Sequence, residues 1–188
     1  SHTATEFVGW YNGHPDYRNK TFDLSHDTAV IFGQGNVAAD VSRILAKTYD
    51  ELKHTDIAAH ALDVLATSKI RHIHVIGRRG PAQAKFTSKE LKEFGELEDA
   101  VAVVDPADLA LNSASEVELA DKTNAGALKV FELFREYAAR PPATTEKRHV
   151  YFSYLKSPVE LLGHEYVQKV RLELNQLAGE PFRQSAQG

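Results

Sequence analysis

The sequence predicts an α/β domain in which helices flank a parallel sheet and a three-stranded antiparallel β-meander follows toward the C-terminus. Three observations support this fold class. An apolar run at 28–32 passes through a glycine-rich turn directly into an amphipathic helix. A second strand-like run at 70–76 follows a helical insert and completes a β-α-β unit. From 148 to 178, three strand signals follow one another with short turns, which is typical of a meander.

Length and composition limit the classes of protein that remain. A chain of 188 residues, 43% of them hydrophobic, suits one main core. We therefore expect one domain at 26–188, preceded by a linker at 1–25. The net charge of -4 argues against a nucleic-acid partner, and no apolar run is long enough for a membrane span. Because the sequence has no cysteine, disulfides, thiolate metal sites and redox dithiols are excluded, and any redox chemistry would need a cofactor.

The first half of the chain supplies the elements of the β-α-β unit. Residues 1–25 are rich in aromatic and turn residues without a sustained helical or strand period, hence the predicted linker. The run at 28–32 is bounded by polar residues and a glycine, as in a strand buried on both faces of a parallel sheet. Apolar residues at 37–45 recur at helical spacing, and a helical insert at 49–68 leads to the strand at 70–76.

The second half predicts one more strand and two more helices before the meander. Thr87, with Glu90 three residues later, has the spacing of a capping box and should begin a helix. A short strand is expected at 101–104, a weakly patterned stretch at 109–120, and a helix at 128–139 that ends before two prolines. The meander strands are expected within three runs: 150–155, 159–162 and 167–177.

The turn between the first strand and its helix has the pattern of a Rossmann-like dinucleotide site. Gly33 permits the tight turn, Gly35 lets a pyrophosphate approach the backbone, and Ala38 permits close packing of helix on strand. Free backbone N–H groups and the positive end of the helix would bind the anion. The alternative is a tight strand-to-helix turn that binds no ligand.

The second strand ends in a basic turn that bears on the choice of dinucleotide. In NAD-binding proteins an acidic residue about 20 residues after the glycines reads the ribose. Here that distance falls in the helical insert, and the next strand ends at Gly77 followed by Arg78 and Arg79. A guanidinium group binds phosphate oxygens in a planar, bidentate manner, so this turn favours the 2′-phosphate of NADP over NAD. The alternative is a solvated basic loop.

The other polar residues give no comparable signal. His72 and His74 point to the same face of one strand, but no third ligand has convincing spacing, so we assign no metal. No serine or aspartate lies in a nucleophile-elbow or triad context, so we assign no catalytic residue.

Several motifs together resemble the adrenodoxin reductase-like ferredoxin-NADP reductases, whose fold is that of the glutathione reductase-like flavoprotein superfamily. The matching segments lie along nearly the whole chain. They are Phe7-Val8-Gly9-Trp10-Tyr11-Asn12-Gly13, Gly33-Gln34-Gly35-Asn36-Val37-Ala38, Gly77-Arg78-Arg79-Gly80-Pro81, Phe86-Thr87 with Lys89-Glu90-Leu91, and Ser157-Pro158. The tryptophan-containing and arginine-containing segments are far more specific than the glycine turn.

The resemblance implies an NADPH-binding domain that is inserted between two halves of an FAD domain. Family enzymes pass electrons from NADPH through FAD to a ferredoxin, so the cofactors implied are NADP here and FAD in the full-length protein. The cofactor-binding residues implied by motif and resemblance are Gly33, Gln34, Gly35, Asn36, Val37, Arg78, Arg79 and Glu90. Glu93 is similar to a family acid near the redox centre. The alternative is that Glu90 is a helix-capping acid and that Glu93 lies on a solvated helix face.

The FAD halves of the family are absent from this sequence, so the chain by itself should not turn over. Two alternatives remain, namely the pyridine-nucleotide domain of a glutamate synthase small subunit and a non-catalytic NADP-binding module. The segment Trp10-Tyr11-Asn12-Gly13 and the absence of cysteine favour the reductase over the glutamate synthase. The resemblance implies a bacterial cytoplasmic protein, with the mitochondrial matrix as the alternative.

Overall fold

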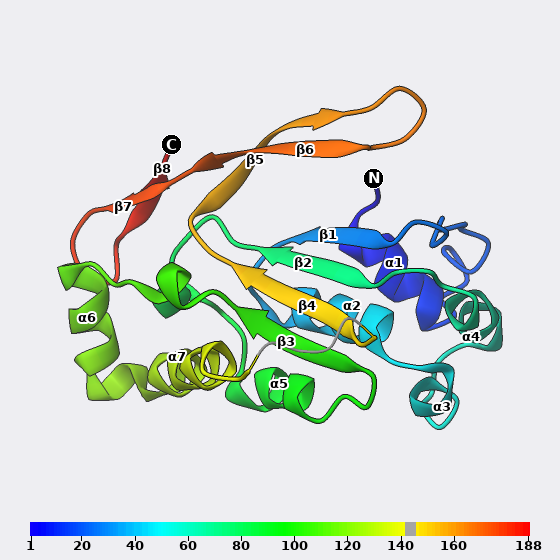
Figure 1. The fold of residues 1–188 in the computed structure, drawn as a ribbon, viewed down its shortest axis with the longest axis horizontal. Coiled ribbons are helices and arrows are strands. Elements are labelled where there is room, and N and C mark those ends of the chain that lie inside the picture. Colours follow the sequence, from blue (N-terminus) through cyan, green and yellow to red (C-terminus); the bar gives the residue numbers. More distant parts are fainter. Residues whose placement is uncertain (142–145) are drawn as a thin grey trace.

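A computed structural model describes residues 1–141 and 146–188 (Figure 1). The α-helices are α1 (Ala4–Tyr11), α2 (Asn36–Ala46), α3 (Tyr49–Leu52), α4 (Ala59–Ala66), α5 (Ser88–Lys92), α6 (Ser113–Ala120) and α7 (Ala125–Ala138). Short 3-10 helices are η1 (Pro81–Gln83), η2 (Glu93–Gly95), η3 (Pro106–Leu109) and η4 (Lys122–Asn124). The strands are β1 (Thr28–Phe32), β2 (His72–Ile76), β3 (Ala100–Val104), β4 (Arg148–Ser153), β5 (Lys156–Leu162), β6 (Lys169–Leu174), β7 (Gln176–Ala178) and β8 (Ser185–Gln187).

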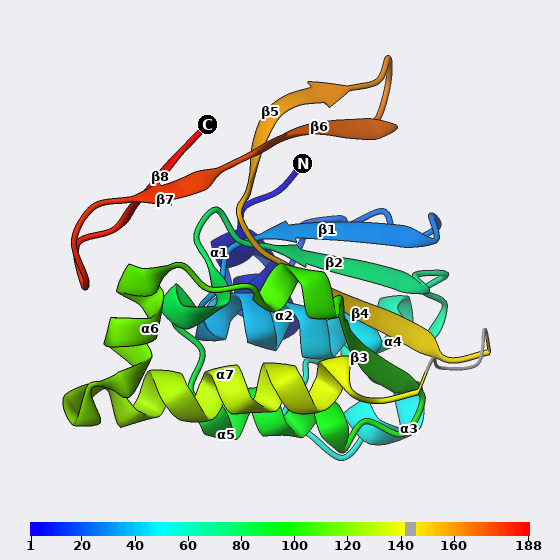
Figure 2. The ribbon, with the colours of Figure 1, turned by 60° about the vertical axis from the view of Figure 1, so that its left-hand side comes forward.

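A four-stranded parallel sheet in the order β1-β2-β4-β3 forms the centre of the fold. Side chains alternate across it, so that Ile73, Val75, Val150 and Phe152 are buried on one face. The helices α2, α5 and α7 pack on that face, where Phe134 completes the core (Figure 2). The opposite face is half-buried along β2, β3 and β4 and exposed along β1, and no described helix covers it.

The predicted α/β class is confirmed, but the antiparallel part is arranged differently from the predicted three-stranded meander at 148–178. Its first strand, β4, instead joins the parallel sheet between β2 and β3, where Val150 and Phe152 are buried. The remaining strands form two separate pairs, β5 with β6 and β7 with β8. In Figures 1 and 2, the β5–β6 hairpin projects away from the parallel sheet, beyond β1. A short apolar run does not reveal whether its partner is parallel, which explains the wrong assignment of β4.

The opening segment also differs from the expected linker, because α1 packs in the core of the domain. Thr3 caps α1 through a capping box with Glu6, and Phe7, Trp10 and Tyr11 are buried, Trp10 to 2% exposure. These three aromatic residues have the helical spacing of three and four, but the helix is too short for the pattern to stand out from its neighbours. The weakly patterned stretch at 109–120 likewise contains α6, which begins after the cap Asn112. Among the described residues, no helix is long and apolar enough to span a membrane.

Candidate nucleotide-binding cleft

A cleft of about 540 Å³ lies at the carboxyl ends of β1 and β2, where parallel sheets commonly bind ligands. It is formed by the turn after β1, the loop after β2 and the beginning of β5. Its lining residues are Phe32, Gly33, Gln34, Gly35, Ile76, Gly77, Arg78, Arg79, Gln83, Lys85, Lys156, Ser157 and Pro158.

The glycine turn presents bare backbone to the cleft. Gly33 has a φ of +147°, a conformation that L side chains rarely adopt, so glycine is needed for the turn itself. Gly35 has an ordinary extended φ of -128°, and a Cβ added there would meet no atom within 4 Å. Because no side chain in the described part of the chain caps α2, the first N–H groups of this helix have no side-chain acceptor there. The turn can therefore donate these hydrogen bonds to an anion at the positive end of α2.

The basic loop after β2 is held by backbone contacts from the β5 side of the cleft. Leu155 N–H donates to Arg79 O (3.1 Å), and Lys156 N–H donates to Gly77 O (3.0 Å). The buried Asn175 donates from Nδ2 to Arg78 O (2.8 Å) and also to Ser157 Oγ (2.8 Å). The backbone of the loop is therefore fixed, while the Arg78 side chain remains exposed and that of Arg79 half-buried.

The charge of the cleft is opposite to that of the whole chain. Although the chain carries a net charge of -4, the described residues that line the cleft include Arg78, Arg79, Lys85 and Lys156 and no aspartate or glutamate. Lys156 is paired with Asp108, which lies outside the lining (Nζ to Oδ2, 3.3 Å). A cleft with several cations and no acid concentrates anions, and the two guanidinium groups provide the geometry for a phosphate.

The structure brings five of the eight predicted cofactor-binding residues into the cleft lining: Gly33, Gln34, Gly35, Arg78 and Arg79. The other three lie elsewhere. The Asn36 side chain accepts a hydrogen bond from Thr87 N–H (2.8 Å), which fastens α5 to the glycine turn. Val37 is 54% exposed on α2, and Glu90 is turned toward Arg43. The lining residues Gln83, Lys85 and Lys156 carried no motif signal in the sequence.

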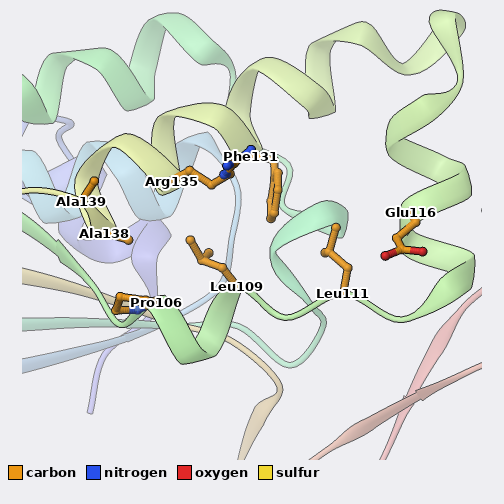
Figure 3. A pocket seen from close by; sticks show the side chains of 8 residues that line it. All are labelled: Pro106, Leu109, Leu111, Glu116, Phe131, Arg135, Ala138 and Ala139. Atoms are coloured by element: carbon orange, nitrogen blue, oxygen red, sulfur yellow. The ribbon is translucent and has the colours of Figure 1, made fainter.

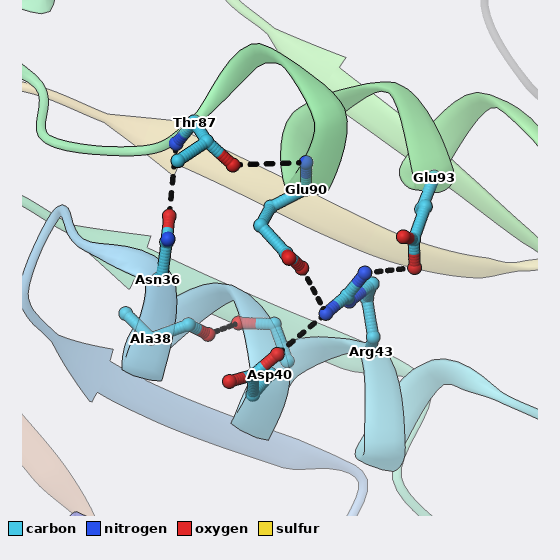
Figure 4. A network of polar contacts seen from close by, with 8 residues as sticks. Asn36, Ala38, Asp40, Arg43, Thr87, Glu90 and Glu93 are labelled. Atoms are coloured by element: carbon cyan, nitrogen blue, oxygen red, sulfur yellow. Dashed lines mark hydrogen bonds and ion pairs between the residues drawn. The ribbon is translucent and has the colours of Figure 1, made fainter.

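An ion network between α2 and α5 surrounds Arg43, a residue that the sequence did not single out (Figure 4). The buried Arg43 guanidinium pairs with Asp40, Glu90 and Glu93. Burial alone would lower the pKa of Arg43, but the three carboxylates outweigh burial and raise it. Only Asp40, three residues before Arg43, could have been paired with it from sequence spacing. In this structure Glu90 of α5 and Glu93 of η2 hold these two elements against α2, together with the bond between Asn36 and Thr87.

A buried polar cluster holds η1, whose Gln83 lines the cleft, against α6 and the segment between β7 and β8. The Glu118 carboxylate accepts hydrogen bonds from Gln83 Nε2 (2.9 Å), Gln184 Nε2 (2.7 Å) and Phe182 N–H (2.8 Å). Burial acts to raise the pKa of Glu118, but these donors stabilise the carboxylate and lower its pKa overall. Gln83 is therefore fixed where it lines the cleft.

A second hollow, of about 530 Å³, lies between η3, α6 and α7 on another part of the surface (Figure 3). Leu109, Leu111 and Phe131 line it, and Arg135 and Glu116 are the only charged residues among its described lining. It has neither a glycine turn nor an excess of cations, so it offers less to a phosphate than the first cleft does.

The two predicted strand histidines lie together on the half-buried face of the sheet. His72 and His74 stack with His149 and Tyr151 of the adjacent β4. His72 Nδ1 lies 3.2 Å from the Tyr151 hydroxyl. Burial lowers the pKa of His74, with smaller contributions from His72 and Lys156. Within 1–141 and 146–188, no group of three or more possible metal ligands comes together.

Comparison with known proteins links the chain to one group of oxidoreductases, although no protein-family model matches it. It is 42% identical over 174 residues to the NADPH-ferredoxin reductase FprA of Mycobacterium leprae. It is 43% identical over 165 residues to the mitochondrial NADPH:adrenodoxin oxidoreductase of Arabidopsis thaliana. The structure of Mycobacterium tuberculosis FprA in complex with NADPH superposes on the chain with a TM-score of 0.90 at 38% identity.

These matches cover nearly all of this chain but less than half of each relative. The alignment with the M. leprae protein spans 93% of this chain and 37% of that protein, and the Arabidopsis alignment spans 86% and 34%. The M. tuberculosis structure covers 100% of this chain, which corresponds to 40% of that chain. The similarity therefore concerns one region of a longer kind of protein.

Proposed function

We propose that this chain, which is homologous to one region of the NADPH-ferredoxin reductases and NADPH:adrenodoxin oxidoreductases, is the NADPH-binding domain of an FAD-dependent ferredoxin-NADP reductase. Its role would be to position NADPH for hydride transfer to FAD, from which electrons pass to a ferredoxin-type iron-sulfur protein. The observation that carries this proposal is the acid-free cleft, in which the Gly33–Gly35 turn faces Arg78 and Arg79.

The cleft fits the two charged parts of NADPH separately. The bare backbone at Gly35 and the uncapped start of α2 suit the pyrophosphate, because a side chain at this position would occupy the space that the phosphates need. Arg78 and Arg79, at the end of the adjacent strand, suit the 2′-phosphate on the adenosine ribose. The residues of this chain therefore bind and orient the nucleotide, and FAD supplies the hydride acceptor.

The remaining parts of the proposal rest on the relatives. A flavin would be held by the part of such proteins that lies outside the aligned region. The mycobacterial relatives favour a bacterial cytoplasmic setting, with the mitochondrial matrix as the alternative suggested by the names of the eukaryotic relatives.

Calorimetric titration of this chain with NADP+ and with NAD+ tests the proposal directly. We expect NADP+ to bind more tightly, because each charge-assisted hydrogen bond to the 2′-phosphate is worth about 1.5–3 kcal/mol. Equal affinities for the two nucleotides would contradict the assignment of Arg78 and Arg79 to the 2′-phosphate. Absence of NADP+ binding would contradict the proposed function as a whole.

Asn175 is expected to support NADP binding without contacting the nucleotide. Its Nδ2 holds the carbonyl of Arg78 (2.8 Å), so in Asn175→Ala the backbone of the arginine loop loses a buried donor. We expect affinity for NADP+ to fall by about 1 kcal/mol, which is the usual worth of one hydrogen bond, with little change for NAD+. A matched control is Asn124→Ala, which removes a similar side-chain bond, to Glu118 O, outside the cleft lining. An equal loss for both nucleotides in Asn175→Ala would indicate general destabilisation instead.

A further inference from the structure

We infer that Lys85 is a third cationic contact of the nucleotide and that it binds the pyrophosphate rather than the 2′-phosphate. This inference rests on the proposed function. Lys85 lines the cleft together with the glycine turn and the two arginines, yet it belongs to no motif in the sequence. It lies in the segment between η1 and α5, far along the chain from the glycine turn.

Backbone pairing brings Lys85 directly beside the turn that would hold the pyrophosphate. Lys85 and Gly35 form an isolated parallel β-bridge, and Lys85 N–H donates to Gln34 O (2.6 Å). Paired residues on neighbouring extended segments lie about 5 Å apart, which is within the reach of a lysine side chain. Lys85 is thus placed next to the open space above Gly35, where a Cβ would meet no atom within 4 Å.

The neighbours of Lys85 direct its side chain away from the core. Ala84 and Phe86 are both buried, at 5% exposure each, whereas Lys85 between them is exposed. Alternation along an extended segment places a residue on the face opposite to its two neighbours. The bond between Thr87 N–H and Asn36 Oδ1 fixes the same segment just after Phe86. The backbone under Lys85 is therefore fixed at both sides.

The charge of Lys85 is also available for a ligand. Among the residues that the structure describes, Lys85 has no ion pair within 4 Å, whereas Lys156 on the β5 side of the cleft is paired with Asp108. The start of a helix contributes only about half a unit of positive charge. A pyrophosphate carries two negative charges, so the glycine turn and α2 alone leave part of this charge uncompensated. A flexible ammonium group beside the turn would compensate it without strict geometry.

Lys85 also interacts with Glu118, whose pKa its positive charge helps to lower, although less than the hydrogen bonds of that carboxylate do. A purely structural role toward Glu118 would affect the stability of the domain and all ligands alike. A role toward the pyrophosphate predicts a different pattern. NADP+ and NAD+ both contain the pyrophosphate, whereas 2′-AMP carries the 2′-phosphate without it.

The test compares Lys85→Ala with the unchanged chain in titrations with NADP+, NAD+ and 2′-AMP, with Lys129→Ala on the exposed side of α7 as the matched control. We expect Lys85→Ala to lower the affinities for NADP+ and NAD+ by the same factor of about ten, since a charge-assisted contact is worth about 1.5 kcal/mol. The affinity for 2′-AMP should be unchanged. The unfolding midpoint should match that of the control.

Three results would overturn the inference. If NADP+ binds to the unchanged chain but Lys85→Ala does not change its affinity, or lowers the affinity for 2′-AMP as much as that for NADP+, Lys85 does not bind the pyrophosphate. The proposed function is then unaffected. If the unchanged chain fails to bind NADP+, the proposed function and the inference fail together. Replacement by arginine, Lys85→Arg, should restore most of the affinity, because the contact depends on charge more than on shape.

Discussion

Replacing Gly35 with valine should weaken binding of both NADP+ and NAD+ by about a hundredfold while leaving the domain folded. The backbone at Gly35 has an extended φ of -128°, which valine adopts readily, and a Cβ there would meet no protein atom within 4 Å. The new side chain would instead occupy the space in front of the first N–H groups of α2. Loss of two charge-assisted bonds to the pyrophosphate would cost about 3 kcal/mol, or about a hundredfold in affinity, measurable by calorimetry.

Two other glycine variants show whether the Gly35 effect is local. Gly126→Val, in the first turn of α7, also places a side chain in open space but lies outside the cleft lining, so binding should be unchanged. Gly33→Ala should reduce stability by about 1–3 kcal/mol, because Gly33 has a φ of +147°. Undiminished binding by Gly35→Val would mean that the pyrophosphate does not lie at this turn. A large loss of stability in Gly35→Val would mean that the open space is not available to a side chain.

The parts of the cleft that the sequence predicted are those whose geometry is local. The run from β1 through Gly33 and Gly35 into α2 is continuous in sequence, and the arginine pair directly follows the adjacent strand. A pattern within about ten residues therefore contained both the conformation of each turn and the residue types that line the cleft. The capping of α5 by Thr87, whose Oγ1 accepts from Glu90 N–H (3.3 Å), was predicted for the same reason.

The features that the sequence did not predict depend on pairing between distant segments. Lys85 faces the cleft because its segment pairs with Gly35, fifty residues earlier in the chain. Arg43 gathers Glu90 and Glu93 only because α5 packs on α2. The position of β4 in the sheet was missed for the same reason. Its buried and half-buried residues alternate much as those of an antiparallel strand would, so its own sequence does not reveal that its neighbours are parallel.

The predicted contact of Glu90 with the cofactor remains a prediction, although its observed position bears on how it could occur. Glu90 is paired with Arg43 and does not line the cleft. Arg43 is also paired with Asp40 and Glu93, so it would keep two carboxylate partners if Glu90 turned toward a bound nucleotide. A contact between Glu90 and the cofactor is therefore compatible with the fold, but it requires the Glu90 side chain to leave its position in this structure.

Replacing both Arg78 and Arg79 with alanine should remove the preference for NADP+ over NAD+. Because both side chains line the cleft, their loss leaves the 2′-phosphate without a guanidinium partner among the described lining residues. At about 1.5–3 kcal/mol for each charge-assisted contact, the binding free energy of NADP+ should weaken by about 3–6 kcal/mol. The loss cannot exceed the difference in binding free energy by which the unchanged chain prefers NADP+ to NAD+. The affinity for NAD+ should stay the same, because that nucleotide has no phosphate at this position.

The discriminating quantity is the ratio of the two affinities, measured by calorimetry on the same preparation. Arg135→Ala, in the apolar hollow of Figure 3, removes an exposed arginine elsewhere and should leave the ratio unchanged. Because the backbone of the arginine loop is held by Leu155, Lys156 and Asn175 rather than by its own side chains, the double variant should keep its fold. If the double variant lost affinity for NADP+ and for NAD+ by the same factor, the arginines would act on a part common to both nucleotides. The pyrophosphate would then be shared between them and Lys85, and the 2′-phosphate would need another partner.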